Sequence, residues 1–174
     1  MTTVATGMER LRFMQGEWDV EAHVMTESGE WMSIPEPYET TIVAMNGGAC
    51  HYEIMPVMVG DERTRLLFSW SYDKFRQHYR MLSCSDADGV MGVLQGNFVE
   101  GTDMVVISDL ETGTAFPGSE QEEAYFRQLA STKTSENSFV DVVSESYDGG
   151  ATWEPVFRAT HIRKVAQNTI SGQA

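Results

Sequence analysis

Apolar and polar residues alternate with a period of two along most of this chain. In the segment Gly16–Met25, Trp18, Val20 and Ala22 alternate with charged or polar neighbours, the pattern of a strand with one buried face. Similar segments recur to the end of the chain. The predicted strands are Gly16–Met25, Tyr38–Met45, Cys50–Val57, Arg65–Tyr72, Gln77–Ser85, Val90–Val99, Met104–Leu110, Tyr125–Thr134, Ser138–Ser146 and Pro155–Arg163. The pattern therefore predicts an all-β protein.

The connections between these strands are mostly short and carry residues that accept a positive φ. Examples are Asn46–Gly48, Asp86–Gly89 and Asp148–Gly150, which suit tight hairpins. Hairpins make consecutive strands antiparallel neighbours. Such a meander leaves two unpaired edges unless the sheet closes on itself. The sequence thus predicts an antiparallel up-and-down β-barrel of about 8–10 strands.

The chain of 174 residues is expected to form a single domain, residues 1–174. Residues 15–164 would form the barrel, and residues 165–174 a tail. Residues 1–14 are expected to form one short helix, because Thr6 and Glu9 have the spacing of a capping box. Two longer connections, Thr26–Pro37 and Glu111–Ala124, would lie at a barrel mouth, the second with a helical turn at Ser119–Glu122.

Composition and charge exclude several classes of partner. A formal net charge of −14 disfavours nucleic acid and anionic membrane surfaces, because both are negatively charged. No apolar stretch has the length of a membrane span, and the first residues lack the pattern of a secretory signal. With only two cysteines, Cys50 and Cys84, a disulfide framework is excluded and the cytoplasm is the expected compartment.

Two motifs indicate structural roles. Gly16 and Trp18 open the first strand as a G-x-W triplet, whose indole would plug the barrel under an arginine of the last strand, Arg163 first and Arg158 second. The segment Ser146–Trp153 fits the Asp-box, a hairpin motif resembling those of sialidase propellers. A propeller needs several copies and a longer chain, so this single copy predicts a stapled hairpin. Its structural residues are Asp148, Gly150 and Trp153.

The candidate site rests on aromatic and charged residues in the middle of strands. A charge inside a barrel is costly unless it is paired, so such residues would pair with one another, as Glu53 with Arg80 or Arg158, or with a ligand. The sequence contains no nucleophile or nucleotide-binding motif, and its four histidines lack metal-ligand spacing. No metal or cofactor is therefore expected. The candidate ligand-binding residues are Glu53, Phe68, Trp70, Tyr72, Tyr79, Arg80, Arg158 and His161.

The chain resembles a bacterial lipocalin-like (calycin-type) family, family 1579 in the series of families of unknown function. The resemblance rests on L-x-x-x-x-G-x-W at Leu11–Trp18, on the turns at Tyr72-Asp73 and Asp88-Gly89, and on D-G-G-x-T-W with Arg163-Lys164 near the end. It covers about residues 8–164 and implies a calycin-like barrel. Related calycin barrels bind small apolar molecules, and the nitrobindins among them bind haem. The residues after Trp18 depart from the glycine-rich nitrobindin opening, which disfavours haem.

Three functional hypotheses stay open. The first is a cytoplasmic barrel that binds a small hydrophobic or amphipathic molecule inside. The second is an isomerase, cyclase or lyase with Glu53 as base, His161, Tyr52 or Tyr79 as acid, and Arg80 or Arg158 holding an anion. The third is a non-catalytic structural module. Both faces of Tyr38–Met45 and of Gln77–Ser85 are equally apolar, which would allow contact with a second subunit in a homodimer.

Overall fold

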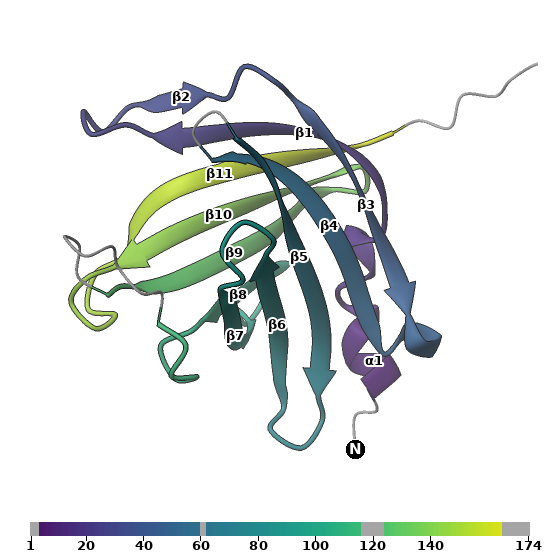
Figure 1. Ribbon diagram of the computed structural model, residues 1–174. Helices are drawn as coiled ribbons and strands as arrows, with labels where there is room; N and C mark the ends of the chain where they lie inside the picture. Colours follow the sequence, from purple (N-terminus) through teal and green to yellow (C-terminus); the bar gives the residue numbers. More distant parts are fainter. Residues whose placement is uncertain (1–3, 60–61, 116–123, 165–174) are drawn as a thin grey trace, which may run out of the picture.

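The computed structural model describes residues 4–59, 62–115 and 124–164, and these form a single antiparallel sheet of eleven strands (Figure 1). The strands are β1 (Gly16–Met25), β2 (Trp31–Ser33), β3 (Tyr38–Met45), β4 (Cys50–Val59), β5 (Glu62–Asp73), β6 (His78–Ser85), β7 (Met91–Phe98), β8 (Met104–Ser108), β9 (Phe126–Ser135), β10 (Ser138–Ser146) and β11 (Glu154–Arg163). Each predicted strand corresponds to one of these, most with ends shifted by one or two residues. The predicted all-β fold is confirmed.

The sheet closes because its last barrel strand pairs with its first. The order β1-β3-β4-β5-β6-β7-β8-β9-β10-β11 follows the chain, and β11 pairs with β1 from Trp18↔Arg163 to Val24↔Phe157. This ring is a closed ten-stranded antiparallel up-and-down barrel. Closure removes the two unpaired edges that a meander would otherwise expose.

The strand β2 lies in a segment that the sequence predicts to be a loop. Trp31 pairs with Met25 at the far end of β1, whereas Tyr38 of β3 pairs with Val20 nearer its start. Pro35 and Pro37 stand between the two strands and have no backbone N–H to donate. One edge of β1 is therefore covered by two successive strands, and β2 is the extra strand outside the ring.

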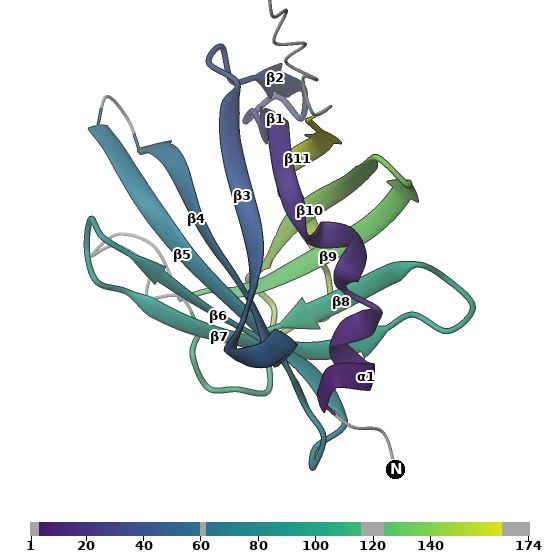
Figure 2. The same ribbon diagram turned by 90° about the vertical axis from the view of Figure 1, so that its right-hand side faces the viewer.

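A short helical segment covers one end of the barrel. The helix α1 (Val4–Glu9) and the 3₁₀ helix η1 (Arg12–Met14) lie beside this end in Figure 2, while β2 lies at the opposite end. We call these the α1 end and the β2 end. The helix begins at Val4, so Thr6 lies inside it and the expected Thr6–Glu9 capping box does not start it. Leu11 is fully buried, which makes the segment a plug.

The core is densest next to this plug. Trp18, Val105, Ile107 and Phe139 are at most 1% exposed, and the Trp18 ring meets the Phe139 ring edge-on at 4.9 Å between centroids. Arg163 lies over the Trp18 ring with Cζ 4.2 Å from its centroid. Its guanidinium also donates hydrogen bonds to the backbone carbonyls of Gln15 and Phe13, which ties β11 to η1.

The hairpin between β10 and β11 is stapled by side-chain hydrogen bonds. Asp148 accepts from the Thr152 amide and hydroxyl at 2.9 and 2.7 Å, and Ser146 Oγ accepts from the Gly150 amide at 2.8 Å. These bonds hold the pKa of Asp148 down to about 2. Gly149 and Gly150 take positive φ values of 73° and 87°, where L-residues are strained. The Asp-box residues thus shape a turn.

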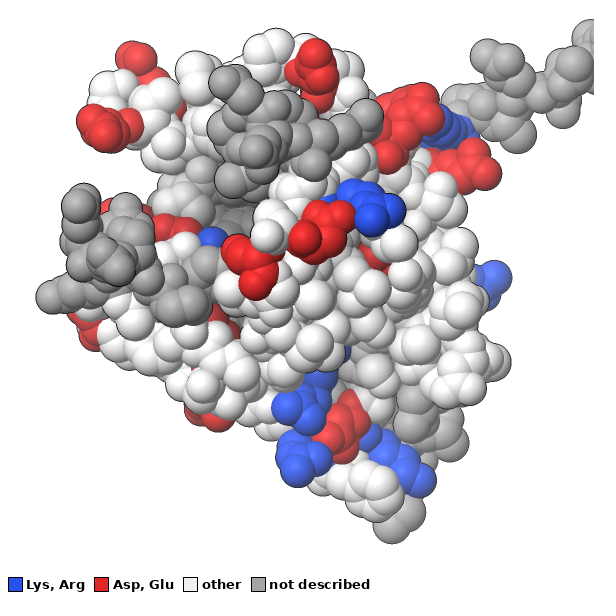
Figure 3. All heavy atoms as spheres, in the orientation of Figure 1, with Lys and Arg blue, Asp and Glu red and all other residues white. Residues whose placement is uncertain are grey.

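Charge is spread unevenly over the surface. In Figure 3, acidic groups are distributed over the upper part of the visible face, whereas basic groups gather near the bottom, around the β5–β6 hairpin. No helix in the described part of the chain has the length and hydrophobicity to cross a membrane. The helical turn expected at Ser119–Glu122 and the tail expected at 165–174 lie outside the described residues.

Candidate functional site

The strand register decides which predicted site residues face the barrel interior. Directly paired residues share one face of a sheet, and the buried Trp18, Val20 and Ala22 mark the inner face. His161 pairs with Val20, and Glu53 pairs with both the buried Ile42 and Phe68. Six of the candidates belong to this inner face: Glu53, Phe68, Trp70, Tyr72, Tyr79 and His161.

The other two candidates, Arg80 and Arg158, stand on the outer face. Arg80 alternates with the buried Tyr79 and Met81 and pairs with Ser71 and Gln95. Arg158 pairs with His23, and its Cζ lies 5.3 Å from the centroid of Trp31. Period-two alternation points both side chains away from Glu53.

The expected pairing of Glu53 with Arg80 or Arg158 is therefore wrong, and neither arginine can hold an anion inside the barrel. Tyr52 is also on the outer face, because it pairs with Val43, which is 39% exposed. It cannot serve as an acid for Glu53.

Most of the aromatic candidates belong to the packed α1 end. Trp70 and Tyr79 are 6% and 4% exposed, and the Tyr79 hydroxyl donates to the Gly7 carbonyl at 2.8 Å. Tyr72 lies against Tyr79 with 5.1 Å between ring centroids. These rings pack against the plug. Phe68 lies two residues before Trp70 on β5, further from the plug, and is only half-buried.

A polar cluster occupies the inner wall beyond the packed core. Glu53 is 8% exposed and accepts a hydrogen bond from the Thr40 hydroxyl at 2.7 Å. On β3, the Tyr38 hydroxyl points to Met55 Sδ at 3.1 Å. His51, a register step closer to the plug, has Nε2 2.7 Å from Gln15 Nε2. The sequence indicates only Glu53 of these as a site residue.

Asp141 is the most informative member of this cluster, and it is not among the predicted site residues. It pairs with Ala159 of β11 and Ser131 of β9, both buried, so it belongs to the inner face. Its side chain keeps 23% of its surface accessible, although the strand register turns it towards the interior. Asp141 is thus an inward-facing carboxyl group that a small molecule could contact.

Burial disfavours the charged form of each member of this polar cluster. Desolvation raises the pKa of both Glu53 and Asp141 to about 7. Desolvation also raises the pKa of the Tyr38 hydroxyl, and the negative charges of Glu53 and Asp141 add to this rise. Hydrogen bonding from Thr40 opposes the shift of Glu53, and the nearby Ser131 hydroxyl opposes that of Asp141. Desolvation lowers the pKa of His161 to about 3 and of His51 to about 4. Near neutral pH the histidines are neutral and the carboxyl groups are close to half-ionised.

Apolar side chains of the inner wall keep accessible surface towards the β2 end. Leu66, Phe68, Val143 and Phe157 all face inward by register, yet each is only half-buried. This contrasts with the almost complete burial of Trp18 and Phe139 at the α1 end. The plugged half of the interior is therefore closely packed, whereas inner-face side chains towards the β2 end keep accessible surface.

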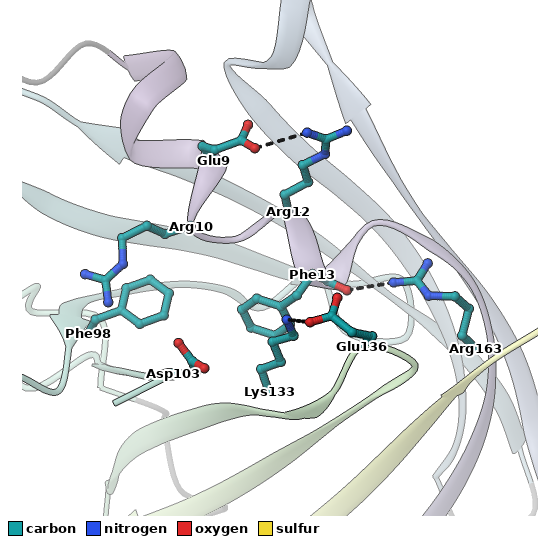
Figure 4. A pocket seen from close by; sticks show the side chains of 9 residues that line it. All are labelled: Glu9, Arg10, Arg12, Phe13, Phe98, Asp103, Lys133, Glu136 and Arg163. Atoms are coloured by element: carbon teal, nitrogen blue, oxygen red, sulfur yellow. Dashed lines mark hydrogen bonds and ion pairs between the residues drawn. The ribbon is translucent and has the colours of Figure 1, made fainter. Parts of the chain in front are cut away.

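A hollow lies outside the barrel at the α1 end. It has a volume of about 410 Å³ and is bordered by η1 and the β9–β10 hairpin (Figure 4). Most of its charged groups are engaged with one another or with aromatic rings: Arg12 with Glu9, Lys133 with Glu136, and Arg10 over the Phe98 ring at 3.7 Å. It is therefore a mixed-charge surface hollow.

The structure offers no arrangement for a metal ion within its described residues, since no three His, Cys, Asp or Glu side chains are grouped to hold one. Cys50 and Cys84 are free thiols.

The closed antiparallel barrel is consistent with the lipocalin-like or calycin-like class of folds. The chain matches no protein-family model, and no curated protein is similar to it in sequence. The resemblance to family 1579 is thus without support from sequence comparison.

Proposed function

We propose that this protein binds a small, largely apolar molecule inside its barrel, with the polar cluster of Tyr38, Glu53 and Asp141 anchoring one end of the ligand. The observation that carries the proposal is Asp141, an inward-facing carboxyl group of β10 that keeps 23% of its side-chain surface accessible. Apolar walls with a few convergent polar groups are the common composition of small-molecule sites. Membership of a lipocalin-like family, such as family 1579, fits this role.

The direct test asks whether the purified protein retains or takes up an apolar molecule. Native mass spectrometry of the protein as purified would reveal a retained ligand. Titration with the neutral dye Nile red would give saturable fluorescence enhancement at one site per chain. Absence of both a retained molecule and saturable dye binding would overturn the proposal.

A matched pair of variants locates the binding. Leu66 and Leu67 are consecutive on β5, but Leu66 faces inward opposite Met55 and Leu67 faces outward opposite Ile54. Leu66→Trp would fill space in the interior and should weaken dye binding about tenfold or more. Leu67→Trp should bind like the parent. Equal affinities for both variants would place the dye outside the barrel.

A second candidate function, general acid–base catalysis, is favoured by the raised pKa values of Glu53 and Asp141, about 7 in each case. A carboxyl group that titrates near neutral pH is suited to exchange protons with a bound substrate. Once a ligand is found, Glu53→Gln separates the two functions. Retained affinity with lost turnover would identify an enzyme, and unchanged turnover would remove Glu53 from the mechanism.

The wider setting is also a proposal. The net charge of −14 and the free cysteines support a cytoplasmic protein without nucleic-acid or membrane partners. The exposed apolar residues Val43, Met45 and Ile54, on the outer face of β3 and β4, support self-association into a homodimer. Sedimentation velocity tests this directly, since a monomer at micromolar concentration would contradict it.

A further inference from the structure

The interior cluster contains acidic groups without a basic partner in the described part of the chain. The basic residues of the inner face are engaged elsewhere: Arg163 with Trp18 and the η1 carbonyls, Lys133 with Glu136, and Arg127 with Glu145. Glu53 has the Thr40 hydroxyl as its hydrogen-bond donor. Asp141 Oδ1 has no hydrogen-bond partner among the described residues.

His161 supplies an independent observation. Its side chain is 2% exposed, and its Nδ1 points towards Asp141 Oδ2 at 4.0 Å, beyond hydrogen-bonding distance. Within the described part of the chain, this Nδ1 has no hydrogen-bond partner. The ring is fixed by stacking on Phe139, with 4.0 Å between centroids and 8° between planes. The Nδ1 atom of His161 is thus buried and, among the described residues, without a hydrogen-bond partner, and it lies near the Asp141 carboxylate.

We propose that the ligand carries a protonated amine on its apolar body, and that this amine binds between Asp141 and His161, with Glu53 as a second acidic group near the site. This inference rests on the proposed ligand-binding function. An ammonium group has several N–H donors and no acceptor. With the imidazole proton on Nε2, the Nδ1 atom of His161 and the Asp141 carboxylate present the acceptors that such a group requires.

The spacing of the acceptors suits one nitrogen atom. For a ligand nitrogen about 2.9 Å from both His161 Nδ1 and Asp141 Oδ2, the angle between the two hydrogen bonds would be roughly 90°. Two N–H bonds of an ammonium group can approach this angle. A ligand carboxylate would be repelled by Glu53 and Asp141. A ligand hydroxyl could bridge the same atoms but would leave the carboxylate charge uncompensated.

The binding of an amine depends on pH in a defined direction. The titratable groups of the inner face around the site are Tyr38 from β3, His51 and Glu53 from β4, Asp141 from β10 and His161 from β11. The ion pair of Arg127 with Glu145 lies further towards the β2 end. Only the ionised carboxylates attract the cation, and alkyl amines stay protonated to about pH 10. Affinity should therefore rise from about pH 5.5 to about pH 8, while binding of a neutral analogue should not rise.

The test compares ligands that share a body and differ in one polar group. Octylamine, octan-1-ol and octanoic acid form one series, and 2-phenylethylamine with 2-phenylethanol forms a second that distinguishes a flexible chain from an aromatic body. Isothermal titration at about pH 8 should show each amine binding about tenfold or more tightly than its alcohol. Octanoic acid should bind most weakly. Asp141→Asn should abolish the preference for the amine, whereas Glu21→Gln, on the exposed outer face of β1, should retain it.

The outcomes separate this inference from the proposed function. Alcohols binding as tightly as amines would overturn the amine assignment and leave an apolar binding protein. No binding by any member of either series, together with no Nile red uptake, would overturn both. The pH dependence of the unmodified protein provides a measurement that does not rely on a variant that must fold. Amine affinity that stays constant or falls with rising pH would contradict the assignment.

Discussion

At the scale of single residues, Asp141 has the greatest consequence for function. Its position between Val140 and Val142 makes it a charge in the middle of an apolar strand, as Glu53 is, although it is not among the predicted site residues. Its partners could not be inferred from that position. His161 is twenty residues away along the chain, and Tyr38 and Glu53 lie on strands further round the ring.

Replacing Asp141 by Asn should stabilise the protein at alkaline pH. Burial raises the pKa of Asp141 from 3.8 to about 7, so the folded state binds this proton more tightly than the unfolded chain. The contribution of Asp141 to stability is present below about pH 4 and is lost as pH rises through about 7. Asp141→Asn should therefore be more stable than the parent at pH 8 by about 2–4 kcal/mol, with no such gain at pH 4.

Urea unfolding at the two pH values measures this difference, with Glu21→Gln as the exposed control. A variant that is less stable than the parent at pH 8 would show that Asp141 is paired in solution rather than desolvated alone.

At the scale of elements, the local pattern of the plug sets which of its residues are buried, and tertiary packing stabilises it. Leu11 is fully buried, while its neighbour Arg12 is exposed and paired with Glu9. The helix α1 has only six residues, too few to be stable alone in water. Packing of Met8, Leu11 and Met14 against the barrel end therefore holds the element in place.

Leu11→Ala should destabilise the protein by about 2–5 kcal/mol, because it leaves a cavity in a packed core. Arg12→Ala removes only an exposed ion pair and should cost less than about 1 kcal/mol. Thermal or denaturant unfolding followed by tryptophan fluorescence compares the two. Similar losses for both variants would mean that the plug is not packed as described.

At the scale of the whole molecule, buried acids and buried histidines give opposing dependences of stability on pH. Glu53 and Asp141 have raised pKa values, so their contributions decrease as pH rises through about 7. His51 and His161 have lowered pKa values, so their contributions are present above about pH 6.5 and are lost as pH falls. Between about pH 4.5 and 6.5 these contributions oppose each other.

Replacing one histidine should expose this opposition. His161 stays neutral in the folded protein but becomes protonated in the unfolded chain at low pH, which destabilises the parent there. His161→Gln removes this destabilisation. The free energy of unfolding of the variant minus that of the parent should fall by about 1.4 kcal/mol per pH unit between pH 4 and 6. Urea titrations at half-unit intervals measure this slope. A difference independent of pH would mean that His161 titrates normally in the folded protein.

The sequence by itself determined the strands, their order and the closure of the barrel. Gly16–Met25, Tyr38–Met45 and Ser138–Ser146 have the same ends in prediction and structure, because period-two alternation and turn residues act locally. The strand β2 was missed because its three residues stand beside prolines, where the local pattern favours a loop.

The tertiary structure alone decided which mid-strand charges enter the interior. Glu53 and Arg80 are each a single charge in the middle of a predicted strand. The register places Glu53 opposite Ile42 on the inner face and Arg80 opposite Gln95 on the outer face. A shift of one residue in register reverses the facing of a strand, and register is set by pairing between strands. The proximity of Asp141 and His161 has the same origin, since the register of β10 with β11 places them at diagonal positions on the inner face.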